Sequence, residues 1–138
     1  MPFHVDPKLQ TEFSELDEAD AIYAATLLHA DNRIGELLNA LDEMGITDDT
    51  LVIFSSDNGP ARGAPNTSLS LTYDTATGLG YGLGAAKGIT GGRKEYKGSL
   101  MEGGIGVPFI ARWPGKIPAG KVDQTNILSA VDLVPTFC

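Results

Sequence analysis

The nine residues Leu51–Gly59, which read LVIFSSDNG, decide how this sequence folds. The first four are apolar and mostly β-branched or aromatic, which is typical of a strand buried on both faces, as in a parallel sheet. Polar and turn-forming residues follow directly. In open α/β sheets, ligands bind beyond the carboxyl ends of the strands. The stretch therefore predicts an α/β fold with a candidate site just after the strand.

The residues before this stretch predict a helix over about 18–44. Apolar side chains recur there at spacings of three and four, which places them on one helix face. They are Ile34, Leu37, Leu38, Leu41 and Met44. Gly45 follows the last of them, where a left-handed cap is expected. A helix followed by a buried strand is half of an α/β repeat.

The rest of the chain predicts fewer regular elements. We expect an extended segment up to residue 17 and mostly loop over residues 59–98. A second buried strand is predicted over Val107–Trp113, and a short strand within Val122–Leu128. Asp132 is predicted to cap the start of a last helix.

Composition narrows the class of protein. The chain has 138 residues, of which 42% are apolar, so a folded core is expected. The net charge is −8, which argues against general nucleic-acid binding. Residues 60–138 nevertheless carry more basic than acidic side chains. Four of the basic ones (Lys87, Arg93, Lys94 and Lys97) fall in one short stretch, and such a local cluster can hold a small anion. Cys138 is the single cysteine, so no intrachain disulfide is possible, and no apolar run is long enough to span a membrane.

Asp57 and Asn58 are the candidate metal ligands. A carboxylate and a carboxamide supply hard oxygen ligands, which suit Ca²⁺ or Mg²⁺. Gly59 lets the backbone turn away sharply after them. The alternative is an ordinary loop, because Asp, Asn and Gly are also common turn residues.

Lys97 is the candidate anion ligand. It lies in a glycine-flanked segment before the second predicted strand, and a lysine can act as a point charge on a sulfate or phosphate oxygen. The alternative is a solvated surface lysine. His4 and His29 are the only histidines. By default both are structural or exposed, and His4 gains interest only beside the other motifs.

Taken in order, these segments resemble the sulfatase family of the alkaline-phosphatase superfamily. The resemblance runs through most of the chain. It is carried by Tyr23–Ala25, Asp31 and Gly35, Gly45–Gly59, Glu102–Ile105, Val107–Pro108, Trp113–Gly115 and Asp132–Thr136. It implies an alkaline-phosphatase-like sheet flanked by helices, present here only as a partial domain. Residues 1–138 would be the central to C-terminal part of a sulfatase catalytic domain, truncated at both ends.

The resemblance also implies roles for single residues. Asp57 and Asn58 match the family's Ca²⁺ ligands, and Lys97 matches a lysine that contacts the substrate sulfate. His4 matches an upstream histidine with the same role, although its sequence context departs from the family pattern. Gly106 stands where the family often has arginine, and Lys94 where arginine is common. The Cys/Ser-x-Pro-x-Arg motif that yields the formylglycine nucleophile does not occur in these 138 residues.

The function implied is hydrolysis of sulfate esters by an arylsulfatase-like parent protein with formylglycine and Ca²⁺. Its substrate would be a sulfated small molecule or a sulfated carbohydrate, and its location periplasmic, secreted or lysosomal. The 138-residue chain alone is expected to be inactive, because two ligands cannot satisfy Ca²⁺. Two alternatives remain open: a phosphodiesterase or phosphonate hydrolase of the same superfamily, and a non-catalytic remnant or binding scaffold.

Overall fold

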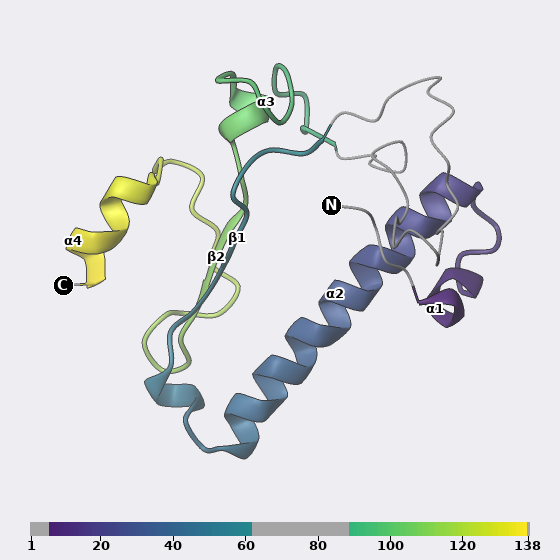
Figure 1. The fold of residues 1–138 in the computed structure, drawn as a ribbon. Coiled ribbons are helices and arrows are strands. Elements are labelled where there is room, and N and C mark those ends of the chain that lie inside the picture. The colour runs from purple at the N-terminus through teal and green to yellow at the C-terminus, as the bar shows by residue number, and fades with distance from the viewer. Residues whose placement is uncertain (1–5, 62–88, 138) are drawn as a thin grey trace, which may run out of the picture.

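The computed structural model describes residues 6–61 and 89–137, which are arranged as a long helix beside a pair of strands (Figure 1). In chain order the elements are α1 (Pro7–Thr11), α2 (Glu18–Glu43), the 3₁₀ helix η1 (Thr47–Asp49), β1 (Val52–Ser55), α3 (Glu102–Ile105), β2 (Phe109–Arg112), the 3₁₀ helix η3 (Ala130–Asp132) and α4 (Leu133–Phe137). Helices and strands are thus mixed, as predicted. Among the described helices, none has both the length and the apolar character that crossing a membrane requires.

The long helix α2 begins and ends at residues that favour its termini. The Asp17 side chain accepts a hydrogen bond from the backbone N–H of Asp20 at 2.9 Å, which caps the first turn. At the other end, Gly45 has a φ of 69°, the left-handed conformation that a glycine adopts without strain. The predicted helix and its glycine cap are therefore confirmed.

The buried core lies at the N-terminal end of α2. Ala21, Ile22 and Ala25 are buried there, close to where α1 contacts α2. The predicted apolar face farther along the helix remains open: Leu37 is 56% exposed and Met44 is 68% exposed. Of the described elements, only α1 and η1 contact α2, so the spacing predicts the face correctly but nothing described covers it.

The first helix, α1, corrects the prediction of an extended segment before residue 17. The Asp6 side chain accepts a hydrogen bond from the backbone N–H of Lys8 at 2.9 Å, and Pro7 occupies the first helical position. Proline fits there because it has no N–H to leave unpaired and its φ is already helical. An Asp-Pro pair at residues 6–7 is thus a helix start in this chain.

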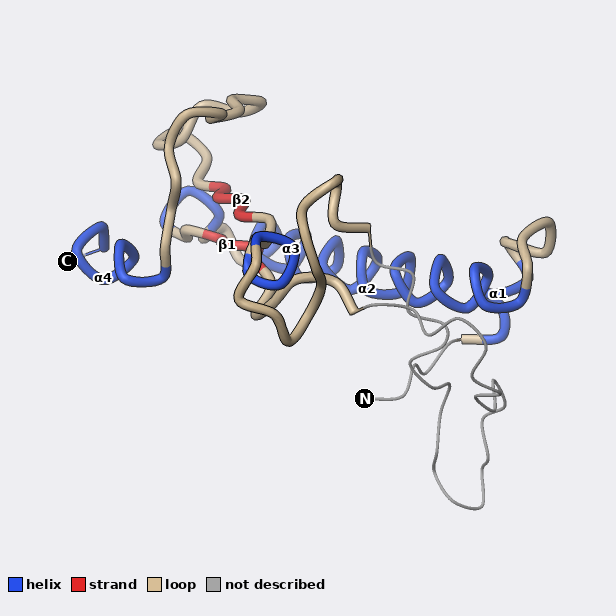
Figure 2. Tube along the Cα trace, turned by 90° about the horizontal axis from the view of Figure 1, so that it is seen from above, coloured by secondary structure: helices blue, strands red, loops and turns tan. Residues whose placement is uncertain are grey.

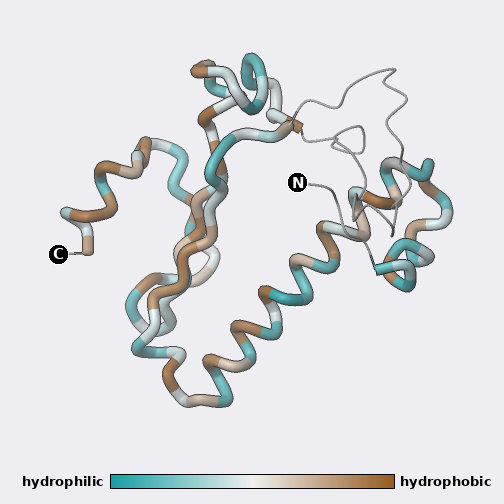
Figure 3. Tube along the Cα trace, viewed as in Figure 1, coloured by the Kyte–Doolittle hydropathy of each residue, from teal (hydrophilic) through white to brown (hydrophobic). Residues whose placement is uncertain are grey.

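The two strands pair antiparallel, with Val52 opposite Arg112 and Ser55 opposite Phe109. The prediction of strands buried in a parallel sheet is wrong for the described residues, because Phe54 is 45% exposed and Ile110 is 59% exposed. A continuous apolar run marks a strand but not its direction, which depends on how the chain returns to it. Figure 2 shows the two short strands within a structure made mostly of helix and loop, and Figure 3 shows that they are predominantly apolar.

Two side-chain hydrogen bonds fix the ends of the strand pair. At one end, the Ser55 hydroxyl donates to the carbonyl of Pro108 at 2.9 Å. At the other, the indole N–H of Trp113 donates to the carbonyl of Asp48 in η1 at 2.7 Å. These bonds tie the last residue of β1 and the helix η1 to the two residues that flank β2.

The C-terminal part differs from its prediction in two details. No strand forms within residues 122–128, where Asp123 instead organises a turn by accepting hydrogen bonds from Thr125 and Asn126. The helix start near Asp132 is confirmed, but the cap is Ser129. Asp132 stands three residues later and accepts a hydrogen bond from the Ser129 backbone N–H at 2.8 Å, which completes a capping box.

Candidate metal and anion site

The loop after β1 presents one exposed carboxylate and one oriented amide. Asp57 is exposed and accepts no hydrogen bond within the described part of the chain. The Asn58 side chain is half-buried, and its Nδ2 donates to the carbonyl of Gly59 at 3.0 Å. That bond engages the amide nitrogen, so Oδ1 remains available as a ligand. Both donors are oxygens, which fits a hard cation such as Ca²⁺.

The residues 89–101, which we call the Lys97 loop, precede α3 and are tied to the loop after β1 by backbone hydrogen bonds. The backbone N–H of Lys97 donates to the carbonyl of Pro60 at 2.9 Å, and that of Gly59 donates to the carbonyl of Gly104 at 2.7 Å. The two loops are far apart in the sequence but adjacent in space. Lys97 therefore stands on a loop adjacent to the one that carries Asp57 and Asn58, and the side chains of Lys97 and Asp57 are both exposed.

Three glycines allow this close approach. A Cβ on Gly59 would lie 2.8 Å from the carbonyl carbon of Gly103. A Cβ on Gly103 would lie 2.7 Å from the carbonyl oxygen of Lys94, and one on Gly104 the same distance from that of Tyr96. Real Cβ atoms do not approach backbone this closely, so only glycine fits. We refer to Gly59, Gly103 and Gly104 as the glycine clasp.

The structure thus brings three of the four predicted site residues together. Asp57, Asn58 and Lys97 flank the glycine clasp, whereas His4 lies outside the described residues. Within residues 6–61 and 89–137, no group of three or more acidic, histidine or cysteine side chains gathers as a metal site would require. The oxygens of Asp57 and Asn58 fit part of a Ca²⁺ shell, which takes six to eight ligands.

Two further residues of the Lys97 loop have features that depend on the fold. Glu95 has a φ of 66°, the only non-glycine residue with a positive φ in the described structure. Arg93 lies against Gly106, whose Cβ would be 3.2 Å from the arginine Cδ. Neither feature has a sequence signature, because both depend on how the loop folds over α3.

Comparisons with known proteins agree with the resemblance. A sequence model of the family described as Sulfatase matches residues 1–138. Arylsulfatase A of Homo sapiens is 32% identical over 115 residues, which are 83% of this chain and 18% of that protein. N-acetylgalactosamine-6-O-sulfatase of Bacteroides thetaiotaomicron is 35% identical over 107 residues, 78% of this chain and 19% of that protein.

A solved structure shares the fold of the chain. The crystal structure of Ps i-CgsB in complex with k-i-k-neocarrahexaose matches with a TM-score of 0.72 and 29% identity, over 99% of this chain and 26% of that one. This chain therefore spans about a quarter of that structure and about a fifth of the length of the curated relatives.

Proposed function

Because this chain belongs to the sulfatase family, we propose that it supplies the metal and sulfate contacts of a sulfuric ester hydrolase. The observation that carries the proposal is the pair of backbone hydrogen bonds that hold the Lys97 loop against the loop of Asp57 and Asn58. A cation and two hard oxygen donors on adjacent loops suit an anion that is bound beside a metal ion.

The residues would divide the work between metal and substrate. Asp57 and Asn58 would hold Ca²⁺, which supplies a positive charge that polarises a sulfate oxygen. Lys97 would neutralise charge on the sulfate oxygens as the ester bond breaks, and His4 would assist there or at the leaving group. Formylglycine would be supplied by residues other than these 138, so the isolated chain would bind weakly and turn nothing over.

The substrate would be a sulfated small molecule or a sulfated carbohydrate. The relatives include arylsulfatases and a sulfatase of N-acetylgalactosamine, and the solved neighbour is bound to a neocarrahexaose. These names favour sulfate esters over the phosphate and phosphonate substrates of the alternative reading. The strongest test of the enzyme class is therefore to measure hydrolysis of a sulfate ester and to identify the bound metal.

The test uses the complete protein in which these residues lie, with 4-nitrophenyl sulfate as the probe. We expect turnover, with calcium as the bound metal. Asp57→Ala should weaken Ca²⁺ binding and lower kcat/KM by about a hundredfold or more, because it removes a charged ligand. Lys97→Ala should lower kcat/KM and leave Ca²⁺ binding unchanged.

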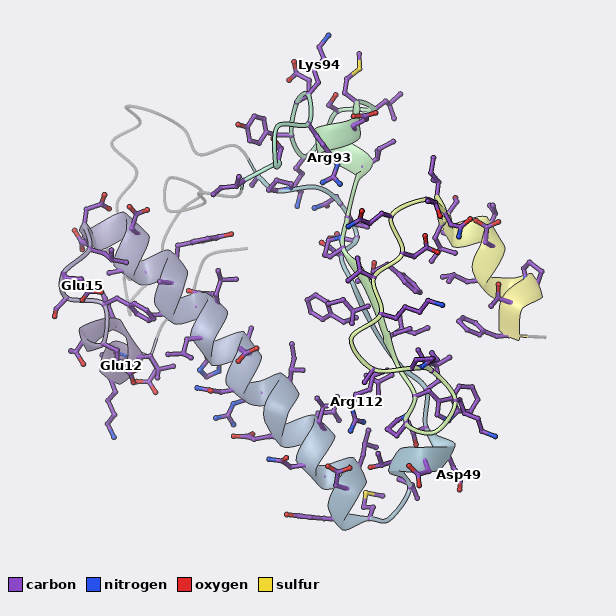
Figure 4. The ribbon with its side chains drawn as sticks, turned by 180° about the vertical axis from the view of Figure 1, so that it is seen from behind. Glu12, Glu15, Asp49, Arg93, Lys94 and Arg112 are labelled. Carbon is purple, nitrogen blue, oxygen red and sulfur yellow. The ribbon has the colours of Figure 1, made fainter. Side chains whose placement is uncertain are left out.

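Two matched controls distinguish these effects from general damage. Asp49 and Lys94 are exposed and labelled in Figure 4, where Asp49 lies near the end of the strand pair remote from the clasp. Asp49→Ala and Lys94→Ala should both retain activity. Bound zinc or manganese in place of calcium, with hydrolysis of a phosphodiester, would replace this proposal with the phosphodiesterase reading. Aryl sulfate turnover by the isolated 138-residue chain would refute the proposal that the nucleophile is supplied by other residues.

A further inference from the structure

The side chain of Arg93, on the Lys97 loop, lies beside the backbone of Gly106. Its side chain crosses Gly106, where a Cβ would lie 3.2 Å from Cδ and 3.3 Å from Nε. The backbone of Gly106 is itself fixed, because its N–H donates to the carbonyl of Glu102 at 2.7 Å. A side chain at residue 106 would therefore crowd the arginine stem, and glycine leaves room for it.

The guanidinium has no partner within the described part of the chain. The ion pair found there joins Arg33 to Glu36, and no carboxylate or carbonyl oxygen accepts from the Arg93 side chain. The side chain is also exposed, and its five N–H donors are not taken up by any residue of 6–61 or 89–137. A planar guanidinium binds two oxygens of one anion at once, which a lysine cannot do.

The backbone between Arg93 and Lys97 fixes where these cations lie. Glu95 adopts a left-handed φ of 66°, which costs a non-glycine residue energy and persists only when its surroundings enforce it. Beside Glu95, the backbone N–H of Gly103 donates to the carbonyl of Lys94 at 2.8 Å, which ties this turn to α3. In Figure 4, Lys94 extends away from the loop, whereas Arg93 lies on the side of α3 that faces the strands.

We infer that Arg93 is a substrate-binding residue, whose guanidinium holds a sulfate group of the substrate beside the Lys97 loop. This inference rests on the proposed function and adds a second cation to it. Arg93 and Lys97 are carried by the same loop, which the glycine clasp fixes against the loop of Asp57 and Asn58. The sulfate held by Arg93 is either the reacting group or a second sulfate on the same molecule.

The test compares Arg93→Gln, Arg93→Lys and the control Lys94→Gln in the complete protein. Inorganic sulfate binding is measured by calorimetry, and KM and kcat with 4-nitrophenyl sulfate and with a disulfated saccharide. We expect Arg93→Gln to weaken sulfate binding or raise KM about tenfold, the loss of a charge-assisted bidentate contact. Arg93→Lys should recover part of the loss, and Lys94→Gln should match the wild type.

The two substrates identify which sulfate is held. A raised KM with both substrates, together with weaker inorganic sulfate binding, assigns Arg93 to the reacting sulfate. A raised KM with the disulfated saccharide alone assigns it to a second sulfate. Unchanged KM and sulfate binding in Arg93→Gln, or an equal loss in Lys94→Gln, would overturn the inference. If the wild-type protein does not hydrolyse the sulfate esters, the proposed function is refuted. Sulfate binding measured by calorimetry would still test the role of Arg93.

Discussion

α2 and the glycine clasp use glycine in opposite ways. Gly35 lies within α2, and a Cβ built there would meet no atom within 4 Å. Gly103 lies in the clasp, where the same added atom would meet the backbone of Lys94 and Glu95. The helix depends on hydrogen bonds along one stretch of chain, whereas the clasp depends on backbone from distant segments meeting without side chains between them. The helix is therefore set by local sequence and the clasp by tertiary approach.

The largest effect is expected from Gly103→Ala, which breaks the clasp. The new methyl group cannot fit beside the carbonyl of Lys94, so the two loops must separate, at a cost of about 3 kcal/mol. The amides of Gly59 and Lys97 donate across this junction, and their hydrogen exchange should accelerate about a hundredfold. Unchanged exchange at both amides would show that the close approach is not required.

Gly35→Ala is the matched change in the helix and should act with the opposite sign. Alanine removes the entropic cost of a glycine in a helix interior, and its methyl group would contact no other atom. The stability of α2 should therefore rise by about 1 kcal/mol. Amide exchange in the middle of α2 should slow about fivefold, while exchange at Gly59 and Lys97 stays as it was. Faster exchange in α2 would mean that Gly35 contacts something other than the described residues.

A smaller stabilisation is expected from Glu95→Gly, which tests whether the loop beside the glycine clasp is strained at Glu95. Glycine adopts a positive φ without the cost that a Cβ imposes, although it loses more entropy on folding, so the net gain is about 0.5 kcal/mol. Exchange of the Gly103 amide, which donates to Lys94, should slow about twofold. A faster exchange would show that the Glu95 side chain itself stabilises the loop.

The smallest effect is expected at the Asp123 turn, a local motif outside both regions. Hydrogen bonds from the Asn126 side chain, then from the backbone of Thr125 and Asn126, hold the pKa of Asp123 well below its usual range. Because the folded pKa is lowered, the turn is fully stabilised above the unfolded pKa of about 4 and weakens as the pH falls through the folded pKa.

The measurement is the pH dependence of the Thr125 and Asn126 amide signals by NMR. Their shifts should stay constant from pH 7 to about pH 4 and change only in stronger acid. Asp123→Asn should remove that change and loosen the turn at neutral pH. A midpoint near pH 4 in the unmodified chain would contradict the lowered pKa.

The contrast between the two regions explains how much of the fold the sequence could predict. Asp17, the apolar spacing and Gly45 all act within a few residues, so the bounds of α2 follow from them. The antiparallel direction of β1 and β2 does not follow from local residues, because it depends on how the chain returns through the Lys97 loop. The helical start at Asp6 and Pro7 was also readable locally, but the two prolines near the N-terminus favoured an extended interpretation.

The site shows the same division. Asp57, Asn58 and Lys97 could be proposed from the sequence because each stands in a segment that resembles a known family. Arg93 stands out in the sequence only as one of the basic residues near Lys97, and the positive φ of Glu95 not at all, because the contacts with Gly106 and Gly103 depend on the fold. A motif indicates which side chains are present, whereas the partners of an arginine emerge only when the backbone around it is placed.

The hydrogen bond between Trp113 and Asp48 has a practical consequence. Trp113 is the single tryptophan of the chain, so its fluorescence comes from one known position. Its indole N–H is held by a carbonyl 65 residues earlier, at the end of the strand pair opposite to the clasp. The emission spectrum therefore reports on that end of the strand pair alone. After dilution into denaturant, the rate of the red shift would measure how fast Trp113 separates from Asp48, independently of the candidate site.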